Sequence, residues 1–455
     1  MKRTIFRATA ASLAVLAPVS AAAVVAPASI AQEAPAPAPA AAEHDTVLSE
    51  QATPFQPESK TAWRSIIKDY NNAGYDNVRE ISAYSEAMNR YVPLVLIQPL
   101  DREKRVNAPT LYLLNGADGG EGRANWLAQT DIIEFYGGNE GKRTDQKKSV
   151  QQGYSEMTSP GIGANVVIPM AGAFSYYTDW ENQNVNLQGK GKGGTPSGKK
   201  QAWETFMTKE LPAALESFQV ADVEKKDKDG KVIAPARAPY NIANGTKAIA
   251  GMSMTGTTSL LYAEHNPGMY SAVGSFSGCA ETTSPLGSSF VNITLNRGGA
   301  NMNQMWGGTN TPTARYNDAL HNARKLKGQE NIYVSNGSGL AGKHDLPTSK
   351  RVNGNLSAAG TVIVEGGVIE VATNGCTHQL RNRTQSLNIP VTYKLRPQGT
   401  HQWGYWQDDT RDFWPVLVKG LDTGAVQPGA AQDPHHAANG GSGSSADMSS
   451  FNPLG

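Results

Sequence analysis

Apolar and polar positions alternate in blocks along the central part of the chain. Eight short runs are rich in β-branched and aromatic residues, and such runs predict strands. They are "REISAYS" (79–85), "RYVPLVLIQP" (90–99), "PTLYLLNG" (109–116), "ANVVIPMAG" (164–172), "KAIAG" (247–251), "SAVGSFSG" (271–278), "NIYVSNG" (331–337) and "PVTYKLRP" (390–397). Among the intervening segments, "TFMTKELPAALESF" (205–218) and "TGTTSLLYAEH" (255–265) predict helices. This alternation favours an α/β fold with a mostly parallel central sheet and helices on both faces.

The two ends of the chain differ from this pattern. Residues 1–31 begin with basic residues, continue as an alanine-rich apolar run and end in small residues, which is typical of a secretory signal peptide. Prolines interrupt the run, which argues against a membrane anchor, and no later stretch is long and apolar enough to span a bilayer. Residues 32–60 predict an Ala/Pro-rich linker, residues 61–425 a single folded domain, and residues 426–455 a low-complexity tail.

Charge and cysteine content narrow the classes of function. The formal net charge is +1, and removal of residues 1–31 deletes three basic and no acidic residues, which leaves −2. A nearly neutral protein gives no electrostatic reason to expect nucleic-acid binding. In an exported protein the two cysteines, Cys279 and Cys376, are expected to form a disulfide rather than remain as thiols.

The stretch "KAIAGMSMTG" places Ser253 between a predicted strand and a predicted helix. This arrangement resembles the GxSxG turn on which α/β-hydrolases carry their nucleophilic serine. Thr255 stands where the pattern has its second glycine, and Gly256 follows it. A serine among small residues at such a turn also occurs for packing reasons alone, so the nucleophile needs further support.

A nucleophilic serine needs a base near neutral pH, and histidine is the usual one. His401 follows the last predicted strand, where α/β-hydrolases place their histidine. It could equally be packed among the tryptophans of "HQWGYW". The other seven histidines lie in the predicted tails, at a helix end or in polar loops: His44, His265, His321, His344, His378, His435 and His436.

The third member of such a triad is an acid between the serine and the histidine in the chain. Glu365 and Glu370 in "VIVEGGVIEVATNGC" are candidates, although either could face solvent from a strand. Asp345 is a poorer candidate in a loop that looks exposed. Two backbone N–H groups must also stabilise the oxyanion. We expect them at Met254, directly after the serine, and at Ala117 in "LYLLNGADGGEG".

Several stretches together resemble the antigen 85 type of mycolyltransferase, an α/β-hydrolase family. They are "LYLLNG", "ANVVIPMAGAFSYYTDWE", "AWETFMTKELPAAL", "AGMSMTG", "QMWGGTNTP", "IYVSNGSG" and "GTHQWGYW". The resemblance spans about residues 80 to 420, and the serial order of the motifs is more specific than any single one. It places the family's nucleophile on Ser253, its histidine on His401 and its acid on Glu370. Thr255 is then a feature that the family shares.

The resemblance also implies further site residues. The family's oxyanion donors fall on the backbone of Met254 and Ala117. Asn115 and Asp118 occupy the places of an aspartate and an arginine that contact trehalose in the family, and Arg123 lies nearby as a substitute. Trp403 matches a tryptophan that lines the family's substrate site, and it could instead be core. We therefore expect substrate contacts from Asn115, Arg123 and Trp403.

The resemblance also implies a role for Cys279 and Cys376. The expected bridge between them would hold the segment that carries the acid.

The implied activity is transfer of a mycoloyl group from trehalose monomycolate to a second trehalose monomycolate, to arabinogalactan or to a protein hydroxyl. This chemistry requires no metal and no organic cofactor. We expect an exported, cell-envelope protein without a membrane anchor in the mature chain. Two alternatives stay open: a secreted carboxylesterase with water as acceptor, and a non-catalytic glycan-binding protein with the same fold.

Overall fold

The computed structural model describes residues 48–49, 62–140, 158–185, 187, 200–226, 229–349, 352 and 354–428. The predicted signal peptide, most of the predicted linker and nearly all of the predicted tail lie outside these residues, as do His435 and His436. Inside the range predicted as a linker, Leu48–Ser49 form a short strand that pairs with the main sheet.

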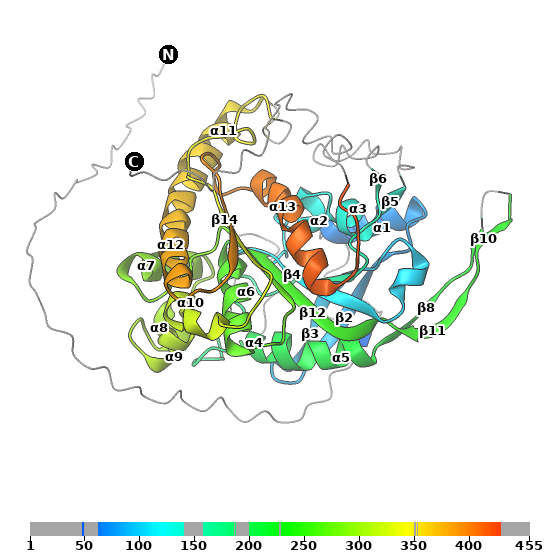
Figure 1. Ribbon diagram of the computed structural model, residues 1–455, viewed down its shortest axis with the longest axis horizontal. Helices are drawn as coiled ribbons and strands as arrows, with labels where there is room; N and C mark the ends of the chain where they lie inside the picture. Colours follow the sequence, from blue (N-terminus) through cyan, green and yellow to red (C-terminus); the bar gives the residue numbers. More distant parts are fainter. Residues whose placement is uncertain are drawn as a thin grey trace, which may run out of the picture. The chain divides into compact units, whose positions relative to one another are not determined.

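A nine-stranded sheet forms the centre of the described chain (Figure 1). In spatial order its strands are β1 (Leu48–Ser49), β2 (Val78–Ser85), β3 (Arg90–Ile97), β7 (Asn165–Pro169), β4 (Ala108–Leu114), β12 (Ala243–Met252), β13 (Ala272–Phe276), β14 (Ile332–Asn336) and β15 (Val391–Leu395). Neighbours from β7 to β15 run parallel, whereas the pairs from β1 to β7 are antiparallel. All eight predicted strands are present, and the predicted α/β-hydrolase fold class is confirmed.

Side chains of the central strands alternate between two hydrophobic cores, one on each face of the sheet. In β4, Tyr112 and Leu114 belong to one core, whereas Leu111 and Leu113 belong to the other. Strands that are covered on both faces bury every side chain, so they appear in the sequence as continuous apolar runs. This is why the strands could be recognised without an alternating pattern.

Helices cover both faces. One core is closed by α1 (Ala62–Asn72), α2 (Trp126–Gln129), α3 (Ile132–Gly137) and α13 (Trp403–Leu421). The other is closed by α4 (Trp203–Thr205), α5 (Leu211–Ser217), α6 (Met254–His265), α7 (Pro285–Arg297), α8 (Met302–Trp306), α9 (Pro312–Tyr316), α10 (Ala319–Asn322) and α12 (Gly367–Ser386). A π-helical turn, Phe206–Glu210, joins α4 to α5, so both predicted helices are present. Among the described residues, no helix has the length and apolar character that crossing a bilayer requires.

The segment that carries Glu365 and Glu370 is helical, so a strand position for either glutamate is wrong. It consists of α11 (Leu356–Thr361), a π-helical turn (Val362–Gly366) and α12. Its β-branched residues lower helix propensity only slightly, and tertiary packing of α12 outweighs that preference.

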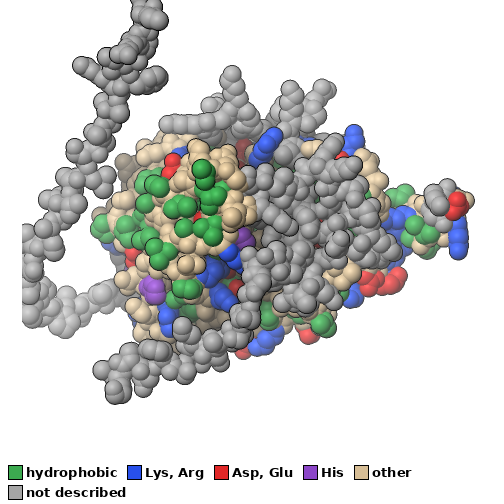
Figure 2. All heavy atoms as spheres, turned by 90° about the horizontal axis from the view of Figure 1, so that it is seen from above, with side chains coloured by type: hydrophobic (Ala, Val, Ile, Leu, Met, Phe, Trp, Pro, Cys, Tyr) green, Lys and Arg blue, Asp and Glu red, His purple; other side chains and the backbone are tan. Residues whose placement is uncertain are grey.

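The outward side of this helical segment is apolar. Leu356, Val364, Val368 and Val371 are each more than half exposed. Figure 2 looks onto this side and shows hydrophobic side chains gathered there. Surface helices usually turn polar side chains outward, so α11 and α12 lack the amphipathic pattern that sequence reading relies on.

Residues 224–226 and 229–231 of a charged stretch of the sequence belong to an arm of paired strands. The arm consists of β8 (Gln219–Asp222), β9 (Lys225–Lys226), β10 (Val232–Ala234) and β11 (Arg237–Asn241). β8 pairs with β11 and β9 pairs with β10, and Figure 1 shows the arm extending away from the central sheet. Three smaller elements complete the fold: the pair β5 (Asn139–Glu140) and β6 (Thr158–Ser159), and the 3-10 turns Arg102–Arg105 and Ala323–Leu326.

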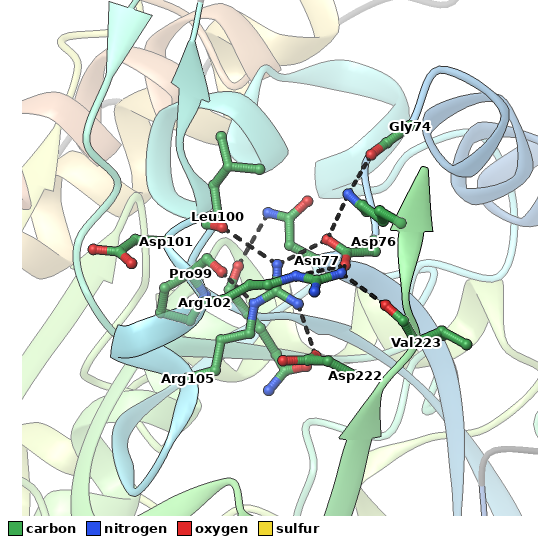
Figure 3. Close-up of polar contacts among 12 residues, drawn as sticks. Gly74, Asp76, Asn77, Pro99, Leu100, Asp101, Arg102, Arg105, Asp222 and Val223 are labelled. Atoms are coloured by element: carbon green, nitrogen blue, oxygen red, sulfur yellow. Dashed lines mark hydrogen bonds and ion pairs between the residues drawn. The ribbon is translucent and has the colours of Figure 1, made fainter. Parts of the chain in front are cut away.

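An ion-pair cluster fastens the base of the arm to the sheet (Figure 3). Arg105 is fully buried and pairs with Asp222 of β8 at 3.0 Å and with Asp76 at 2.9 Å. Arg102 and Lys225 also contact Asp76. Burial alone would raise the pKa of Asp76, but the hydrogen bonds from Arg105, Arg102 and Lys225 hold that pKa well below its ordinary value. Asp76 is therefore a carboxylate at neutral pH.

Candidate active site

Ser253 is the single residue between β12 and α6. β12 ends at Met252, α6 begins at Met254, and Ser253 has φ 57° and ψ −122°. A positive φ is uncommon for a residue with a side chain, and such strain clusters at functional sites. The same strained strand-to-helix turn carries the nucleophile of α/β-hydrolases. The backbone at Ser253 thus has the geometry that the sequence pattern predicts.

The structure explains why the pattern has Thr255 in place of its second glycine. Helix α6 approaches the next strand closely at Gly256, where a Cβ atom would lie 2.9 Å from the carbonyl oxygen of Phe276. At the preceding position there is room for a side chain. The Thr255 hydroxyl donates to the Asn115 carbonyl at 2.8 Å and lies 3.1 Å from the amide of Met252. Thr255 therefore ties the turn to the loop after β4.

Ser253, His401 and Glu370 form a continuous chain of polar contacts. His401 Nε2 lies 2.7 Å from Ser253 Oγ, and His401 Nδ1 lies 2.7 Å from Glu370 Oε2. The serine directly precedes α6, the glutamate lies in α12, and the histidine lies in the loop between β15 and α13. The three groups have the order and contacts of a nucleophile, a base and an acid that orients the base.

Donors from three positions hold the other oxygen of Glu370. Oε1 accepts from Ser277 Oγ at 2.8 Å, from Asn336 Nδ2 at 2.8 Å and from the Gly337 amide at 2.6 Å. These bonds leave Oε2 directed at His401. Glu365, the alternative acid, is exposed on the π-helical turn.

Sequence reasoning missed Ser277 and Asn336. They lie at the carboxyl ends of β13 and β14, which follow β12 in the sheet. A usable signal existed, because binding residues in open α/β sheets gather at the carboxyl ends of the strands. Trp406 was also given no role. Its ring packs edge-to-face on His401 with centroids 5.0 Å apart, and its Nε1 lies 3.1 Å from Ser277 Oγ.

The two positions expected as oxyanion donors follow the carboxyl ends of neighbouring strands. Met254 is the first residue of α6, and Ala117 lies in the loop after β4, the strand beside β12. The carbonyl of Ala117 accepts from the Phe174 amide at 2.6 Å, which holds this loop against the segment after β7. The arrangement suits two backbone N–H groups that are in place before substrate binds.

The three residues expected to contact the substrate, Asn115, Arg123 and Trp403, differ in their exposure to solvent. Asn115 is fully buried, its amide nitrogen donates to the Pro169 carbonyl at 2.9 Å, and its oxygen accepts from the Trp126 amide at 3.2 Å. Asn115 thus shapes the loop from within. Arg123 is exposed on that loop. Trp403, at the start of α13, is partly buried and packs edge-to-face on Trp126, with centroids 5.3 Å apart.

Two carboxyl groups follow Ala117 in the same loop and have raised pKa values. Burial raises the pKa of Asp118 to about 6 and that of Glu121 to about 7. The charge of Arg90 counteracts this effect at Glu121, and burial lowers the pKa of Arg90 to about 10. This side of the site therefore contains groups that titrate near neutral pH.

A disulfide links Cys279, in the loop after β13, to Cys376 in α12. The predicted bridge is confirmed, and it joins the loop beyond Ser277 to the helix that carries Glu370. The described part of the chain contains no group of three or more His, Cys, Asp or Glu side chains arranged to hold a metal ion.

The strained serine turn, the sheet topology and the Ser253–His401–Glu370 contacts are those of a serine hydrolase or acyltransferase of the α/β-hydrolase class. A family model described as "Putative esterase" matches residues 85–412, and the chain belongs to this esterase family.

Curated relatives give a finer comparison. The chain is 28% identical over 329 residues to "Diacylglycerol acyltransferase/mycolyltransferase Ag85A" of Mycobacterium leprae, which covers 71% of this chain and 78% of the relative. The protein of the same name from Mycobacterium tuberculosis H37Rv is 25% identical over 334 residues, with the same coverage. The crystal structure of Mycobacterium tuberculosis MPT51 (FbpC1) covers 74% of this chain and 96% of its own, with a TM-score of 0.50 and 18% identity. The antigen 85 resemblance indicated by the motifs is thus confirmed, and the MPT51 comparison supports the fold alone.

Proposed function

We propose that this protein is an exported serine acyltransferase that moves a mycoloyl group between envelope glycolipids. One observation carries the proposal: Ser253 Oγ, His401 and Glu370 are joined by two contacts of 2.7 Å at a strained strand-to-helix turn. Similarity to relatives named diacylglycerol acyltransferase/mycolyltransferase supports the substrate class. Trehalose monomycolate is the proposed donor.

In the first half-reaction, Ser253 Oγ attacks the ester carbonyl carbon while His401 Nε2 takes the hydroxyl proton. The backbone N–H groups of Met254 and Ala117 stabilise the oxyanion. As the tetrahedral intermediate collapses, the bond to the sugar oxygen breaks and His401 returns the proton to that oxygen. Trehalose leaves, and the acyl group remains on Ser253. Glu370 keeps Nδ1 protonated and stabilises the charged imidazolium.

In the second half-reaction, a hydroxyl of the acceptor attacks the carbonyl carbon of the acyl-enzyme while His401 takes the hydroxyl proton. As the second tetrahedral intermediate collapses, the bond from the acyl carbon to Ser253 Oγ breaks, His401 returns the proton to Oγ, and the acylated acceptor leaves. The acceptor is a second trehalose monomycolate, arabinogalactan or a protein hydroxyl.

Arg123 and Trp403 are proposed to contact the sugar. Arg123 is exposed on the loop after β4, which also carries Ala117, and Trp403 begins α13 two residues after His401. Asn115 is not proposed to contact the sugar, because its side-chain amide is hydrogen-bonded to the protein backbone. No step needs a metal or an organic cofactor.

Membership of an esterase family favours one second candidate, a carboxylesterase in which water attacks the acyl-enzyme. The triad serves both reactions, because it does not select the attacking hydroxyl.

Incubation of the purified protein with trehalose monomycolate separates the candidates. Dimycolate with release of trehalose supports transfer, whereas free mycolic acid alone supports hydrolysis and contradicts the proposed function. The Ser253→Ala variant is the control and should form neither product. Lack of turnover together with lack of fluorophosphonate labelling would indicate a binding protein and overturn both enzymatic proposals.

Export is proposed on two grounds: the signal-peptide pattern of residues 1–31 and the disulfide between Cys279 and Cys376. The size of the secreted chain in culture medium or envelope fractions would locate the cleavage site predicted after residue 31.

A further inference from the structure

Asp345 is a fully buried carboxyl group beside the proposed triad but outside it. The sequence placed it in a loop that looks exposed. The structure puts it in the segment between β14 and α11, in a turn closed by its own amide, which donates to the Gly342 carbonyl at 2.9 Å. A buried carboxylate is costly unless several donors surround it, so its partners indicate what it does.

Four donors surround Asp345, and three of them belong to the segment that carries His401. Oδ1 accepts from Thr400 Oγ1 at 2.5 Å and from Gln402 Nε2 at 3.0 Å. Oδ2 accepts from the Tyr405 hydroxyl at 2.6 Å and from the Gly342 amide at 2.7 Å. One carboxylate therefore holds the residue before His401, the residue after it and the first turn of α13.

Two contacts outside the triad hold His401 itself. Its amide donates to the Gly366 carbonyl at 3.1 Å, which fixes the loop against the turn that leads into α12. The His401 ring packs edge-to-face on Trp406, and backbone bonds of Gly399 to Gly339 and Leu340 hold the start of the loop. The bonds that Asp345 accepts from Thr400 and Gln402 add side-chain anchors on both sides of the histidine and so restrict rotation of the loop about residue 401.

We propose that Asp345 is a positioning residue, which acts through Thr400, Gln402 and Tyr405 to keep the His401 ring aligned between Ser253 and Glu370. This inference rests on the proposed catalytic role of Ser253 and His401. Hydrogen bonds to a carboxylate are stronger than those between neutral groups. The Asp345 carboxylate can therefore fix the positions of the three side chains that donate to it. Small displacements of a general base can lower the rate by about 10²-fold.

The test replaces Asp345 by asparagine, which keeps the shape and removes the charge. The readouts are hydrolysis of p-nitrophenyl butyrate and the rate of fluorophosphonate labelling, both per folded molecule. For Asp345→Asn we expect kcat to fall by about 30- to 100-fold while KM stays within about threefold, and labelling to slow in parallel. A role in stability alone would reduce the folded fraction and leave kcat per folded molecule unchanged.

Asp408→Asn is the matched control. Asp408 is also a buried carboxylate, and it pairs with His344 at 2.9 Å and with Lys343 at 2.9 Å rather than with the His401 loop. Its loss should lower stability but change kcat per folded molecule by less than about threefold. If Asp345→Asn and Asp408→Asn had the same kcat, the positioning role would be rejected.

A pair of variants at Thr400 keeps the test decisive if Asp345→Asn does not fold. Thr400→Ser retains the hydroxyl that donates to Asp345 and should keep kcat within about threefold of wild type. Thr400→Val has nearly the same shape but no donor and should lose about tenfold. Equal rates for the two variants would overturn the inference. If wild-type protein neither reacts with the probe nor cleaves the ester, the proposed function fails instead, so the two failures are distinguishable.

Discussion

At the scale of single residues, Glu370 and Glu365 show how position on one helical segment separates two similar side chains. Glu370 is fully buried and has donors on both carboxylate oxygens, counting the ring nitrogen of His401. Glu365 is exposed to solvent five positions earlier. Only the first can orient the imidazole and compensate its positive charge.

The first prediction uses this contrast. Glu370→Gln should lower kcat by at least about 10²-fold, because an amide can turn its NH₂ group toward His401 Nδ1 and favour the wrong tautomer. Glu365→Gln should leave kcat within about twofold. Steady-state kinetics with a soluble ester give both values. A large loss for Glu365→Gln with normal activity for Glu370→Gln would show that the acid has been misassigned.

The positions of candidate site residues were predictable where they depended on local pattern. Ser253 followed from a strand-to-helix turn, and His401 followed from its place after the last strand. Glu370 could be chosen over Glu365 only through the family resemblance. The position of Ser277 after a strand was a usable signal, but its partner Glu370 lies 93 positions away; Asp345 had no such signal, because its bond to Thr400 spans 55 positions.

At the scale of elements, the disulfide connects two parts of the site that are distant in sequence. It spans 97 positions and joins the loop after β13 to α12. Both parts hold the same carboxylate, since Ser277 donates to Glu370 and Glu370 lies in α12. The bridge therefore acts on the geometry around the acid as well as on the unfolded chain.

The second prediction concerns loss of this bridge. The double variant Cys279→Ser, Cys376→Ser should lose about 4 to 5 kcal/mol of unfolding free energy in the chain-entropy model. Denaturant unfolding followed by fluorescence measures this loss. We also expect kcat per folded molecule to fall, because α12 gains freedom to move relative to Ser277. If kcat per folded molecule stayed at the wild-type value, the bridge would contribute only to stability.

Strands were easiest to predict where burial was nearly complete. The strands β3, β4, β7, β13 and β14 were found because their apolar runs are buried on both faces, whereas β15 was found from its β-branched and aromatic residues although its side chains are partly buried or exposed. The helices α11 and α12 were missed because the glycine- and valine-rich segment 356–377 resembles a strand and turns apolar residues outward. The paired strands of the arm were missed because charged residues dominate 224–231 and their pairing partners come from the arm itself.

At the scale of the whole molecule, the carboxyl groups of Asp118 and Glu121, in the loop after β4, link stability to pH. The pKa of Glu121 is about 7 in the folded protein and 4.5 for an ordinary glutamate. Between these values the folded state binds more protons than the unfolded state, so stability falls as pH rises from about 4.5 to 7. Asp118, with a pKa raised to about 6, contributes in the same direction.

The third prediction follows from this linkage. The variant Glu121→Gln cannot ionise, so its melting temperature should fall less than that of wild type between pH 5 and pH 8. The difference in unfolding free energy at pH 8 should be at most about 3 kcal/mol in favour of the variant. Differential scanning calorimetry across this pH range measures both curves. Parallel curves for the two proteins would contradict the assignment of this pH dependence to Glu121.

The residues that build the tight turn at Ser253 should be kept in evolution for a structural reason that is separate from catalysis. A Cβ atom at Gly251 would lie 2.5 Å from the Thr255 carbonyl oxygen, and one at Gly256 would lie 2.9 Å from the Phe276 carbonyl oxygen of β13. These glycines and the Thr255 hydroxyl are needed to build the turn, whether or not the serine reacts. A descendant that lost catalysis would therefore be expected to keep the surrounding motif and to change at Ser253, His401 or Glu370. In comparisons among related genomes, the motif would then trace the ancestry of the fold, and the three side chains would trace the activity.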